Sequence, residues 1–134
     1  MNVLKKRVAA IVVTYNRRDL LLRCIEGIKN QSLAPDLIII VDNASTDGTL
    51  QFLNQQRVAD GENIKIIELN ENSGGAGGFC VGIATAIDLN FDWVWVMDDD
   101  ACPHVTALEE LLKVAVNPQN IYGSLAVAGP HSAW

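Results

Sequence analysis

Three consecutive aspartates, Asp98 to Asp100, directly follow the apolar run Trp93–Met97. Adjacent carboxylates repel one another, so each needs solvent or a cation close by. Alternate side chains of an extended segment point the same way, so Asp98 and Asp100 are expected to converge while Asp99 faces elsewhere. Two carboxylates with an otherwise open shell suit Mg²⁺ or Mn²⁺, which add water and phosphate oxygens. A solvated acidic turn is the alternative, and the position after a buried strand favours the metal site.

A second chemical signal is the glycine-rich stretch NENSGGAGGF, residues 70–79. Its spacing does not match the dinucleotide-binding fingerprint, and it lacks the Lys-Ser or Lys-Thr pair of a P-loop. Glycines permit close backbone approach, and N–H groups at a helix start can bind an anion. We therefore expect a loop that approaches an anion, with a flexible turn packed on the sheet as the alternative. The residues concerned are Asn72, Gly74, Gly75, Gly77 and Gly78.

A carboxylate and an amide, Asp42 and Asn43, follow the apolar run Leu37–Val41. These groups can pair with the N–H and carbonyl groups of a nucleobase or with ribose hydroxyls, whereas a local Asx turn is the alternative. Arg17 and Arg18 either reach a diphosphate or stand solvated at a helix start. No Ser/His/Asp or Cys/His nucleophile system can be assembled from the sequence.

The elements that must position these residues alternate between strand and helix. Short apolar, β-branched runs predict strands at Val8–Thr14, Leu37–Val41, Ile64–Leu69, Phe91–Met97 and Ser124–Ala128. Apolar residues at helical spacing predict helices over Asp19–Lys29, around Leu50–Leu53, on a face formed by Phe79, Ile83, Ala86 and Ile87, and after Pro103. In the fourth strand, alternation assigns Trp93, Trp95 and Met97 to the core.

This alternation predicts an α/β fold with a mostly parallel, Rossmann-like sheet and helices on both faces. Ligands bind at the carboxyl ends of the strands in such sheets. The segments TYNRR, DNASTDGT, NENSGGAGG and DDD each follow one predicted strand. All four polar segments are therefore expected at one edge of one sheet.

The composition fits a single domain that can bury a core. The chain has 134 residues, of which 49% are hydrophobic and 19% are charged, as is typical of one globular domain. The net charge of −6 argues against nucleic acid as the main partner. Seven of the ten Lys and Arg residues fall between Lys5 and Lys29, and acids dominate afterwards. The first part of the chain is thus suited to face an anion, and the later part to hold a cation.

The cysteines and the first residues bear on the compartment. Cys24, Cys80 and Cys102 are odd in number and widely spaced, which favours reduced thiols in a cytoplasmic protein over disulfides or a zinc site. The run VAAIVV after the first lysines is too short for a secretory core or a membrane span. The N-terminal lysines leave a peripheral contact with the inner face of the membrane open.

Together the polar segments offer a base or ribose binder, an anion-binding backbone and a two-carboxylate metal site. This set suits a nucleoside diphosphate carrying a leaving sugar, because a divalent ion and backbone amides would neutralise charge on the departing diphosphate. A non-catalytic nucleotide-binding module is a second hypothesis. A sugar nucleotidyltransferase is a third, but such enzymes normally carry a glycine-rich basic loop after the first strand, and TYNRR lacks the glycines.

The same segments resemble the motifs of family 2 glycosyltransferases with the GT-A fold. The resemblance rests, in order, on VVTYNRRDLLLRCIEGIKNQS, IIIVDNASTDGT, LNENSGGAGGFCVGI and DWVWVMDDDACP. It covers nearly the whole chain, and the combination of GGAGGF with DDD is most similar to the galactofuranosyltransferase and rhamnosyltransferase branches. It implies inverting, metal-dependent sugar transfer from a UDP- or dTDP-linked donor to a glycan or lipid-linked acceptor, as in cell-wall polysaccharide biosynthesis.

The resemblance also implies roles for individual residues. The nucleotide pocket would be lined by Thr14, Tyr15, Asn16 and Arg17, with Asp42 on the base, while Asn72–Gly78 would lie along the donor. Asp98 and Asp99 would lie near ribose or sugar, and Asp100 would be the surest metal ligand. Because the three aspartates are consecutive, the resemblance does not decide which two match the DxD pair of the family. Strand alternation favours Asp98 and Asp100 as the pair that binds Mn²⁺ or Mg²⁺.

The chain departs from this family in one respect. Family members carry an acceptor-binding second half with an acidic catalytic base, and no candidate base follows the helix after Pro103, where Glu109 and Glu110 are expected to be solvated. We therefore expect residues 1–134 to form the nucleotide-sugar-binding part of a longer GT-A domain. On this expectation the chain alone binds a nucleotide with its metal but transfers sugar poorly.

Overall fold

The computed structural model describes residues 6–60 and 63–115 of the chain. They form a four-stranded sheet in the order β3-β2-β1-β4, in which every pair of neighbours is parallel. The strands are β1 (Val8–Thr14), β2 (Leu37–Asp42), β3 (Ile64–Glu68) and β4 (Trp93–Asp98). The helices are α1 (Arg18–Lys29), α2 (Thr49–Asp60), α3 (Gly74–Asp88) and α4 (Ala107–Ala115). The predicted parallel α/β sheet is confirmed, while the fifth strand expected at Ser124–Ala128 lies outside the described residues.

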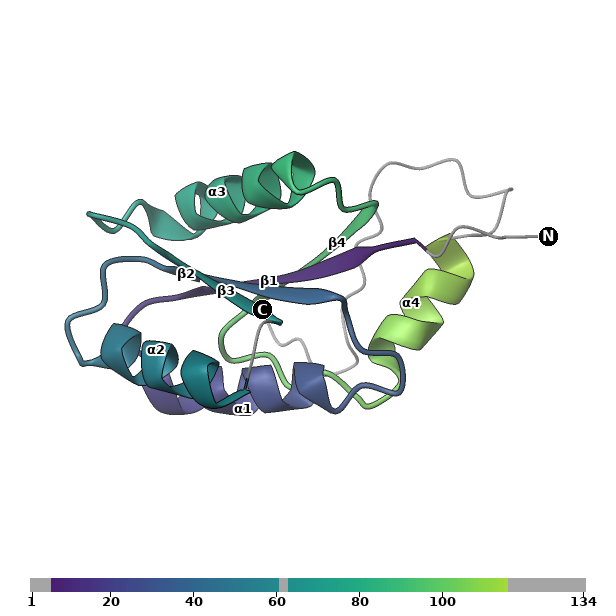
Figure 1. Ribbon diagram of the computed structural model, residues 1–134, viewed down its shortest axis with the longest axis horizontal. Coiled ribbons are helices and arrows are strands. Elements are labelled where there is room, and N and C mark those ends of the chain that lie inside the picture. Colours follow the sequence, from purple (N-terminus) through teal and green to yellow (C-terminus); the bar gives the residue numbers. More distant parts are fainter. Residues whose placement is uncertain (1–5, 61–62, 116–134) are drawn as a thin grey trace.

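Helices cover both faces of the sheet, as the strand pattern predicted. α3 lies on one face, and α1 and α2 lie on the other (Figure 1). All seven residues of β1 are buried, because this strand is flanked by β2 and β4 and covered on both sides. Ala10 and Val12 pack toward Leu21 and Ile25 of α1, whereas Ile11 packs toward α3. Each fully buried aliphatic side chain stabilises the fold by about 1.5–3 kcal/mol.

α3 packs against β1 through glycines. An added Cβ would lie 2.5 Å from a methyl carbon of Val13 at Gly78, and 2.5 Å from a methyl carbon of Ile11 at Gly82. Only glycine allows this close approach of helix and strand. The helix begins at Gly74, so the expectation of a glycine loop through Gly78 is wrong, because sheet packing overrides the poor helix propensity of glycine.

One predicted apolar position on α3 is also wrong. Ile87 was expected on the buried face of the helix, but its side chain is 64% exposed. Ala86 is buried, and Phe79 and Ile83 are half-buried against the same core cluster. The buried stripe of α3 is therefore carried by Gly78, Gly82 and Ala86, at the spacing that lets the helix backbone lie on β1.

β4 is less buried than the sequence suggested. Trp95 and Met97 pack against the α1 side of the core but are only partly buried, and Trp93 is also only half-buried. Val94 and Val96 are 39% and 46% exposed. The cause is the strand order, because β4 pairs only with β1 among the described strands and thus lies at an edge of the described sheet.

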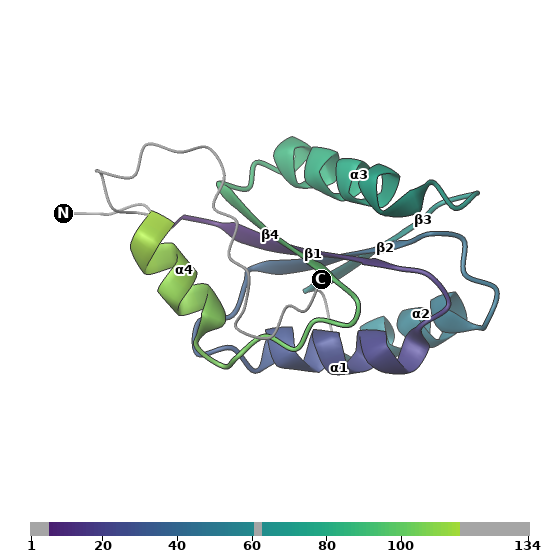
Figure 2. The ribbon, with the colours of Figure 1, turned by 180° about the vertical axis from the view of Figure 1, so that it is seen from behind.

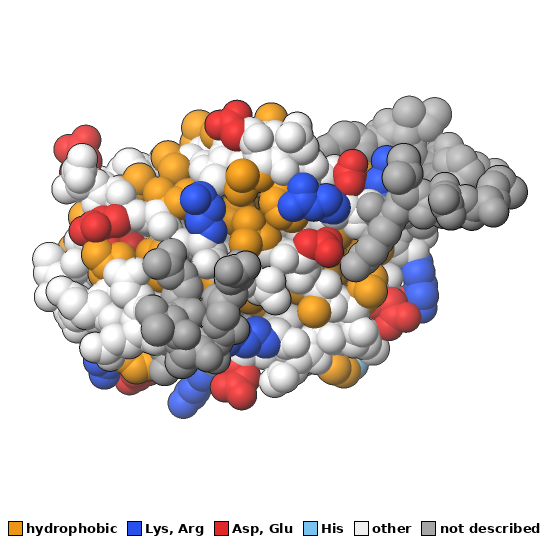
Figure 3. Space-filling view, viewed as in Figure 1, with side chains coloured by type: hydrophobic (Ala, Val, Ile, Leu, Met, Phe, Trp, Pro, Cys, Tyr) orange, Lys and Arg blue, Asp and Glu red, His pale blue; other side chains and the backbone are white. Residues whose placement is uncertain are grey.

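β3 lies at the opposite edge of the described sheet. Its residues Ile66 and Ile67 are half-buried, against the α1 side and the α3 side of the core respectively. The view onto this edge shows hydrophobic side chains between the two helix layers, flanked by Lys and Arg (Figure 3). Apolar side chains on both faces of β3 are therefore partly exposed to solvent at this edge.

The segment that follows β4 runs back along α1 toward α4 (Figure 2). The buried Gln31 holds it there, since its Nε2 donates to the carbonyl oxygens of Gly27 (3.1 Å) and His104 (2.7 Å). Its Oε1 accepts from the backbone N–H of Leu108 at 3.0 Å, in the first turn of α4. Gln31 thereby satisfies a helix-start donor and anchors the chain a few residues after the aspartates.

Candidate functional site

The polar segments after the strands meet at one edge of the sheet, as the parallel topology predicted. In the strand register, Val13 pairs with Val41 on one side and with Asp98 on the other, and Thr14 pairs with Asp42. The backbone N–H of Asn43 donates to the carbonyl oxygen of Thr14 at 2.9 Å. The ends of β1, β2 and β4 therefore form one continuous edge.

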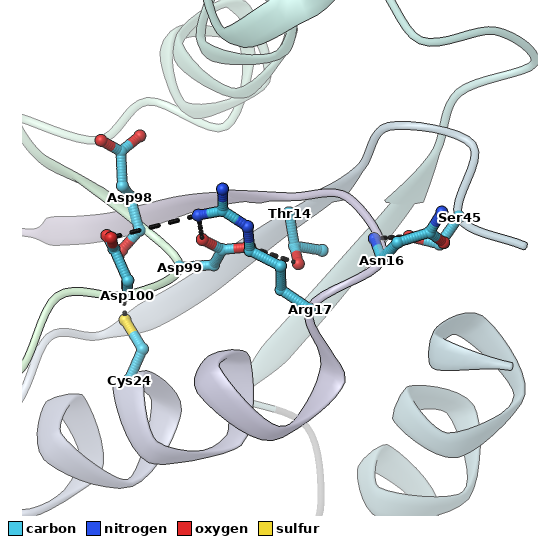
Figure 4. Close-up of polar contacts among 8 residues, drawn as sticks. All are labelled: Thr14, Asn16, Arg17, Cys24, Ser45, Asp98, Asp99 and Asp100. Carbon is cyan, nitrogen blue, oxygen red and sulfur yellow. Dashed lines mark hydrogen bonds and ion pairs between the residues drawn. The ribbon is translucent and has the colours of Figure 1, made fainter. Parts of the chain in front are cut away.

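Asp99 turns inward and links β4 to the end of β1. Its Oδ2 accepts a hydrogen bond from the Thr14 hydroxyl at 2.9 Å, and its Oδ1 lies 3.5 Å from Nη1 of Arg17 (Figure 4). Only 4% of the residue is exposed. Burial raises the pKa of the Asp99 carboxyl above its ordinary value, although the Thr14 hydroxyl and the Arg17 guanidinium act in the opposite direction. Asp99 thus links the turn after β4 to Thr14 and Arg17 within the site.

The other two aspartates are exposed. Asp98 ends β4, and the N–H of Ala101 closes a turn onto the Asp98 carbonyl oxygen at 3.1 Å. The alternation expected of an extended segment therefore stops at Asp98, and Asp99 and Asp100 lie in this turn. The expectation that Asp99 faces away from Asp100 is not met, since Asp99 Oδ1 and Asp100 Oδ2 both lie near Arg17 Nη1. The turn and the bond of Asp99 to Thr14 are the cause.

The other contacts of this turn come from Arg17 and Cys24. Asp100 Oδ2 lies 4.0 Å from the same Arg17 nitrogen that contacts Asp99. The Cys24 thiol donates to the Asp98 carbonyl oxygen at an S–O distance of 3.7 Å (Figure 4). The Asp98 carboxylate points away from Arg17 in the same view. Asp98 and Asp100 thus offer oxygen atoms at the surface of the turn.

Asn16 joins the loop after β1 to the loop after β2. Its backbone N–H donates to Ser45 Oγ at 3.0 Å, and its Oδ1 accepts from the N–H of Thr46 at 2.7 Å. Asn16 adopts a positive φ of 51°, a conformation that Asn tolerates better than most residues. Its neighbour Tyr15 is 43% exposed, so the ring lies at the surface beside this junction.

Asp42 and Asn43 are engaged in internal hydrogen bonds. Both carboxylate oxygens of Asp42 accept from Ser45, one from its N–H and one from its hydroxyl, as the Asx-turn alternative expects. Asn43 Nδ2 donates to the carbonyl oxygen of Gly74 at 2.9 Å, and its Oδ1 accepts from the N–H of Ser73 at 3.0 Å. Asp42 and Asn43 are 1% and 3% exposed. They hold the loop after β2 and the start of α3 together.

Sequence reasoning missed the hydroxyl residues Ser45, Thr46 and Ser73 in this network. Their residue type was a usable signal, because Ser and Thr in polar loops such as DNASTDGT and NENSGG commonly form hydrogen bonds to nearby backbone and polar groups. Their partners Asn16, Asp42 and Asn43 were identified. The pairing itself depends on the fold, since Asn16 and Ser45 are far apart in the chain.

The glycines of the third segment divide into two groups. Gly74 and Gly75 begin α3 with open space where a Cβ would be, and Gly74 has a positive φ of 73°. At Gly77 a Cβ would meet Ser73 Oγ at 2.5 Å, and Gly78 is buried against Val13. Asn72 is exposed, and its Oδ1 accepts from the N–H of Gly74 at 2.9 Å. The open backbone of the helix start is therefore at Gly74 and Gly75, whereas Gly78 serves packing.

Arg18 points away from the site. Its Nε lies 3.6 Å from Asp19, and its guanidinium lies over the ring of Phe52 of α2 at 5.6 Å. Two arginines were candidates for contact with a diphosphate. Arg17 is the one whose guanidinium contacts the turn Asp98–Ala101, called the aspartate turn below.

The oxygen donors of the turn fit a divalent cation of the Mg²⁺ or Mn²⁺ type. Within residues 6–60 and 63–115, no group of three or more His, Cys, Asp or Glu side chains is arranged to hold a metal ion. The exposed carboxylates of Asp98 and Asp100 supply hard oxygen ligands, and these ions complete such a shell with water and substrate phosphates. The donor set therefore suits a metal that arrives together with a phosphate ligand.

The family model described as "Glycosyl transferase family 2" matches residues 9–133. The chain belongs to this family. Galactofuranosyltransferase GlfT1 of Mycolicibacterium smegmatis is 37% identical over 109 residues, which are 81% of this chain and 35% of that protein. GlfT1 of Mycobacterium tuberculosis is 40% identical over 95 residues, or 69% of this chain and 30% of that protein. This family 2 chain thus spans about a third of the length of these relatives.

Solved structures of other proteins share the fold of this chain. The mannosyltransferase PcManGT from Pyrobaculum calidifontis, in complex with GDP-Man and Mn²⁺, has a TM-score of 0.74 at 26% identity, covering 87% of this chain and 34% of that one. S. aureus TarS 1-349 in complex with UDP-GlcNAc has a TM-score of 0.67 at 26% identity, covering 81% of this chain and 30% of that one. Both structural neighbours were solved with a nucleotide sugar.

Within the described part of the chain, no helix has the length and apolarity that crossing a membrane requires.

Proposed function

We propose that this chain binds the nucleotide-diphosphate sugar donor of a glycosyl transfer reaction, together with Mn²⁺ or Mg²⁺. The observation that carries the proposal is the aspartate turn, where two exposed carboxylates and the Arg17 guanidinium lie beside the ends of β1 and β2. Cationic and anionic groups side by side suit a diphosphate with its metal. The proposed donor is of the UDP-galactofuranose or dTDP-rhamnose type, and the names of two relatives, both galactofuranosyltransferases, favour the first.

Each part of the edge has a distinct task in this proposal. Thr14, Tyr15 and Asn16 line the nucleoside end, while the buried Asp42 and Asn43 hold the loop beside it. The N–H of Gly75 faces the donor from the start of α3, where the N–H of Gly74 is bonded to Asn72. Asp98 and Asp100 would hold the metal, which would neutralise charge on the departing diphosphate. Asp99 orients the turn through Thr14, and Arg17 offers N–H donors to phosphate oxygens.

The catalytic base is not among these residues. Glu109 accepts from the Ser32 hydroxyl at 2.7 Å, and Glu110 lies 2.9 Å from Lys113. Both belong to α4, which follows the segment that runs back from the carboxyl edge of the sheet along α1 (Figure 2). We propose that the acceptor, a glycan or a lipid-linked sugar, attacks the anomeric carbon with inversion, with proton transfer to a group outside the described residues.

Calorimetric titration with UDP, dTDP and GDP, each with and without Mn²⁺, tests the donor site. We expect UDP or dTDP to bind, and to bind more tightly with the metal, because the two exposed carboxylates need a cation to hold a diphosphate. Binding of no nucleotide under any of these conditions would contradict the proposal. Tighter binding of GDP than of the other two would keep the donor site but overturn the proposed nucleotide.

A further inference from the structure

Arg17 lies across the aspartate turn and contacts two of its carboxylates. Its Nη1 is 3.5 Å from Asp99 Oδ1 and 4.0 Å from Asp100 Oδ2 (Figure 4). The two contacts differ in character, because the Asp99 side chain is 6% exposed whereas those of Arg17 and Asp100 are 56% and 58% exposed. The contact with Asp99 is the better shielded of the two, and the contact with Asp100 is long and open to water.

We propose that Arg17 is a built-in counter-ion that competes with the divalent cation at Asp100 and passes to the diphosphate when the donor binds. This inference rests on the proposed function, since it assigns the metal to Asp100. A guanidinium beside a carboxylate lowers the attraction of that carboxylate for another cation, because the two positive charges repel. Without nucleotide the turn therefore binds a divalent ion weakly.

The geometry allows the Arg17 guanidinium to move from Asp100 to a phosphate while the hydrogen bond between Asp99 and Thr14 is kept. Both aspartate contacts run through Nη1, while the guanidinium fork carries five N–H donors. The backbone is fixed, since the Arg17 carbonyl oxygen accepts from the N–H of Leu21 at 2.9 Å in α1. The fork can thus rotate toward a phosphate, which it binds in bidentate fashion, while Asp99 keeps its bond to Thr14.

The consequence is that metal and diphosphate promote each other's binding through Arg17. A diphosphate draws the guanidinium from Asp100, and this raises the affinity of the turn for the metal. By thermodynamic linkage the metal raises the affinity for the diphosphate by the same factor. Removal of the Arg17 charge should therefore strengthen metal binding alone and weaken the coupling.

The test measures binding of Mn²⁺ alone to the full chain, from the electron paramagnetic resonance signal of the free ion, followed by UDP or dTDP titration with and without Mn²⁺. Arg17→Gln is compared with Arg18→Gln, which removes the same charge from a neighbour that contacts Asp19 and Phe52. Asp100→Ala gives the background from other acidic residues, and thermal melting checks that each variant is folded. We expect Arg17→Gln to bind Mn²⁺ about threefold to tenfold more tightly than wild type, with Arg18→Gln unchanged.

The outcomes separate this inference from the function on which it rests. Tighter Mn²⁺ binding by Arg17→Gln together with a reduced effect of Mn²⁺ on nucleotide affinity supports the counter-ion role. Equal or weaker Mn²⁺ binding by Arg17→Gln, or an equal gain in both glutamine variants, overturns it, while the donor site stands if wild type binds nucleotide with metal. Failure of the wild-type chain to bind Mn²⁺ with or without nucleotide overturns both.

Discussion

The two halves of the candidate site satisfy their polar groups in opposite ways. After β1 and β2, the side chains of Asp42 and Asn43 are buried and bonded to neighbouring loops. After β4, Asp98 and Asp100 face solvent, and the contact of Asp100 with Arg17 is long. Buried bonded groups define a structure, because leaving one unpaired is costly, whereas exposed charges contribute little to stability. The first half is thus preformed, and the second is free to respond to ions.

The largest effect expected from this contrast is on binding in the second half. Asp100→Ala should weaken Mn²⁺-dependent binding of UDP or dTDP by about 100-fold, because the proposed metal ligand is lost. The free energy of unfolding should change by less than about 0.5 kcal/mol, since the side chain is exposed. Calorimetry and chemical denaturation measure the two quantities. Asp19→Ala removes a more exposed charge from the first turn of α1 and should leave nucleotide binding unchanged; a matching loss of binding there would contradict the contrast.

In the first half the main effect should be on stability. Asn43→Ala removes the amide that bonds the carbonyl oxygen of Gly74 and the N–H of Ser73. We expect the free energy of unfolding to fall by about 1–3 kcal/mol, because the Gly74 carbonyl and the Ser73 N–H lose their hydrogen-bond partner next to the buried Asn43 site. Urea denaturation measures the change. Asn72→Ala, which removes one exposed hydrogen bond to the N–H of Gly74, is the control and should lose less. An equal loss in both variants would show that the Asn43 bonds are not the cause.

The link between the halves should give an intermediate result. Thr14→Val removes the hydroxyl that donates to the buried Asp99 carboxylate. A hydrogen bond to a charged group contributes about 1.5–3 kcal/mol, so we expect a loss of about 1.5 kcal/mol or more together with weaker nucleotide binding. Thr14→Ser keeps the hydroxyl and should retain most of both. A Thr14→Val variant as stable as wild type would show that the hydrogen bond between Thr14 and Asp99 does not stabilise the fold.

The smallest effect concerns Cys24, beneath the aspartate turn. Burial raises the pKa of its thiol from 9.0 to about 12, so the folded chain keeps the proton where the unfolded chain loses it. The free energy of unfolding should therefore fall as the pH rises above 9.0, and less so in Cys24→Ala. At pH 8 an aromatic disulfide reagent should label the exposed Cys80 and Cys102, and the third thiol only after denaturant is added. Equal labelling rates for all three would contradict this.

Much of the fold could be predicted because its signals are local. The apolar β-branched run of β1 and the one-sided apolar pattern of α1 are readable from neighbouring residues. The glycines of α3 were misjudged because their reason for being helical is Val13 and Ile11 on another element. The exposure of Val94 and Val96 was missed because the pattern of a strand does not say which neighbours it has in the sheet.

The candidate site could be predicted in position but not in orientation. The rule that ligands lie at the carboxyl ends of parallel strands brought Thr14, Asp42 and Asp98 together correctly. The sequence could not show that Asp42 bonds Ser45 or that Asp99 bonds Thr14, since such pairings require the distances between loops. Arg17 and Arg18 looked equivalent in sequence, and only the direction of each side chain separates them.

The contact of α3 with β1 has a consequence for how the site keeps its width. Because Gly78 and Gly82 lie directly on Val13 and Ile11, direct contact sets the distance between the helix and the central strand. The gap between the helix start and Thr14 is then set by this contact and not by the length of the connection after β3. Residues inserted between Leu69 and Asn72 would bulge into solvent, at a small entropic cost, while the opening across the sheet edge kept its span.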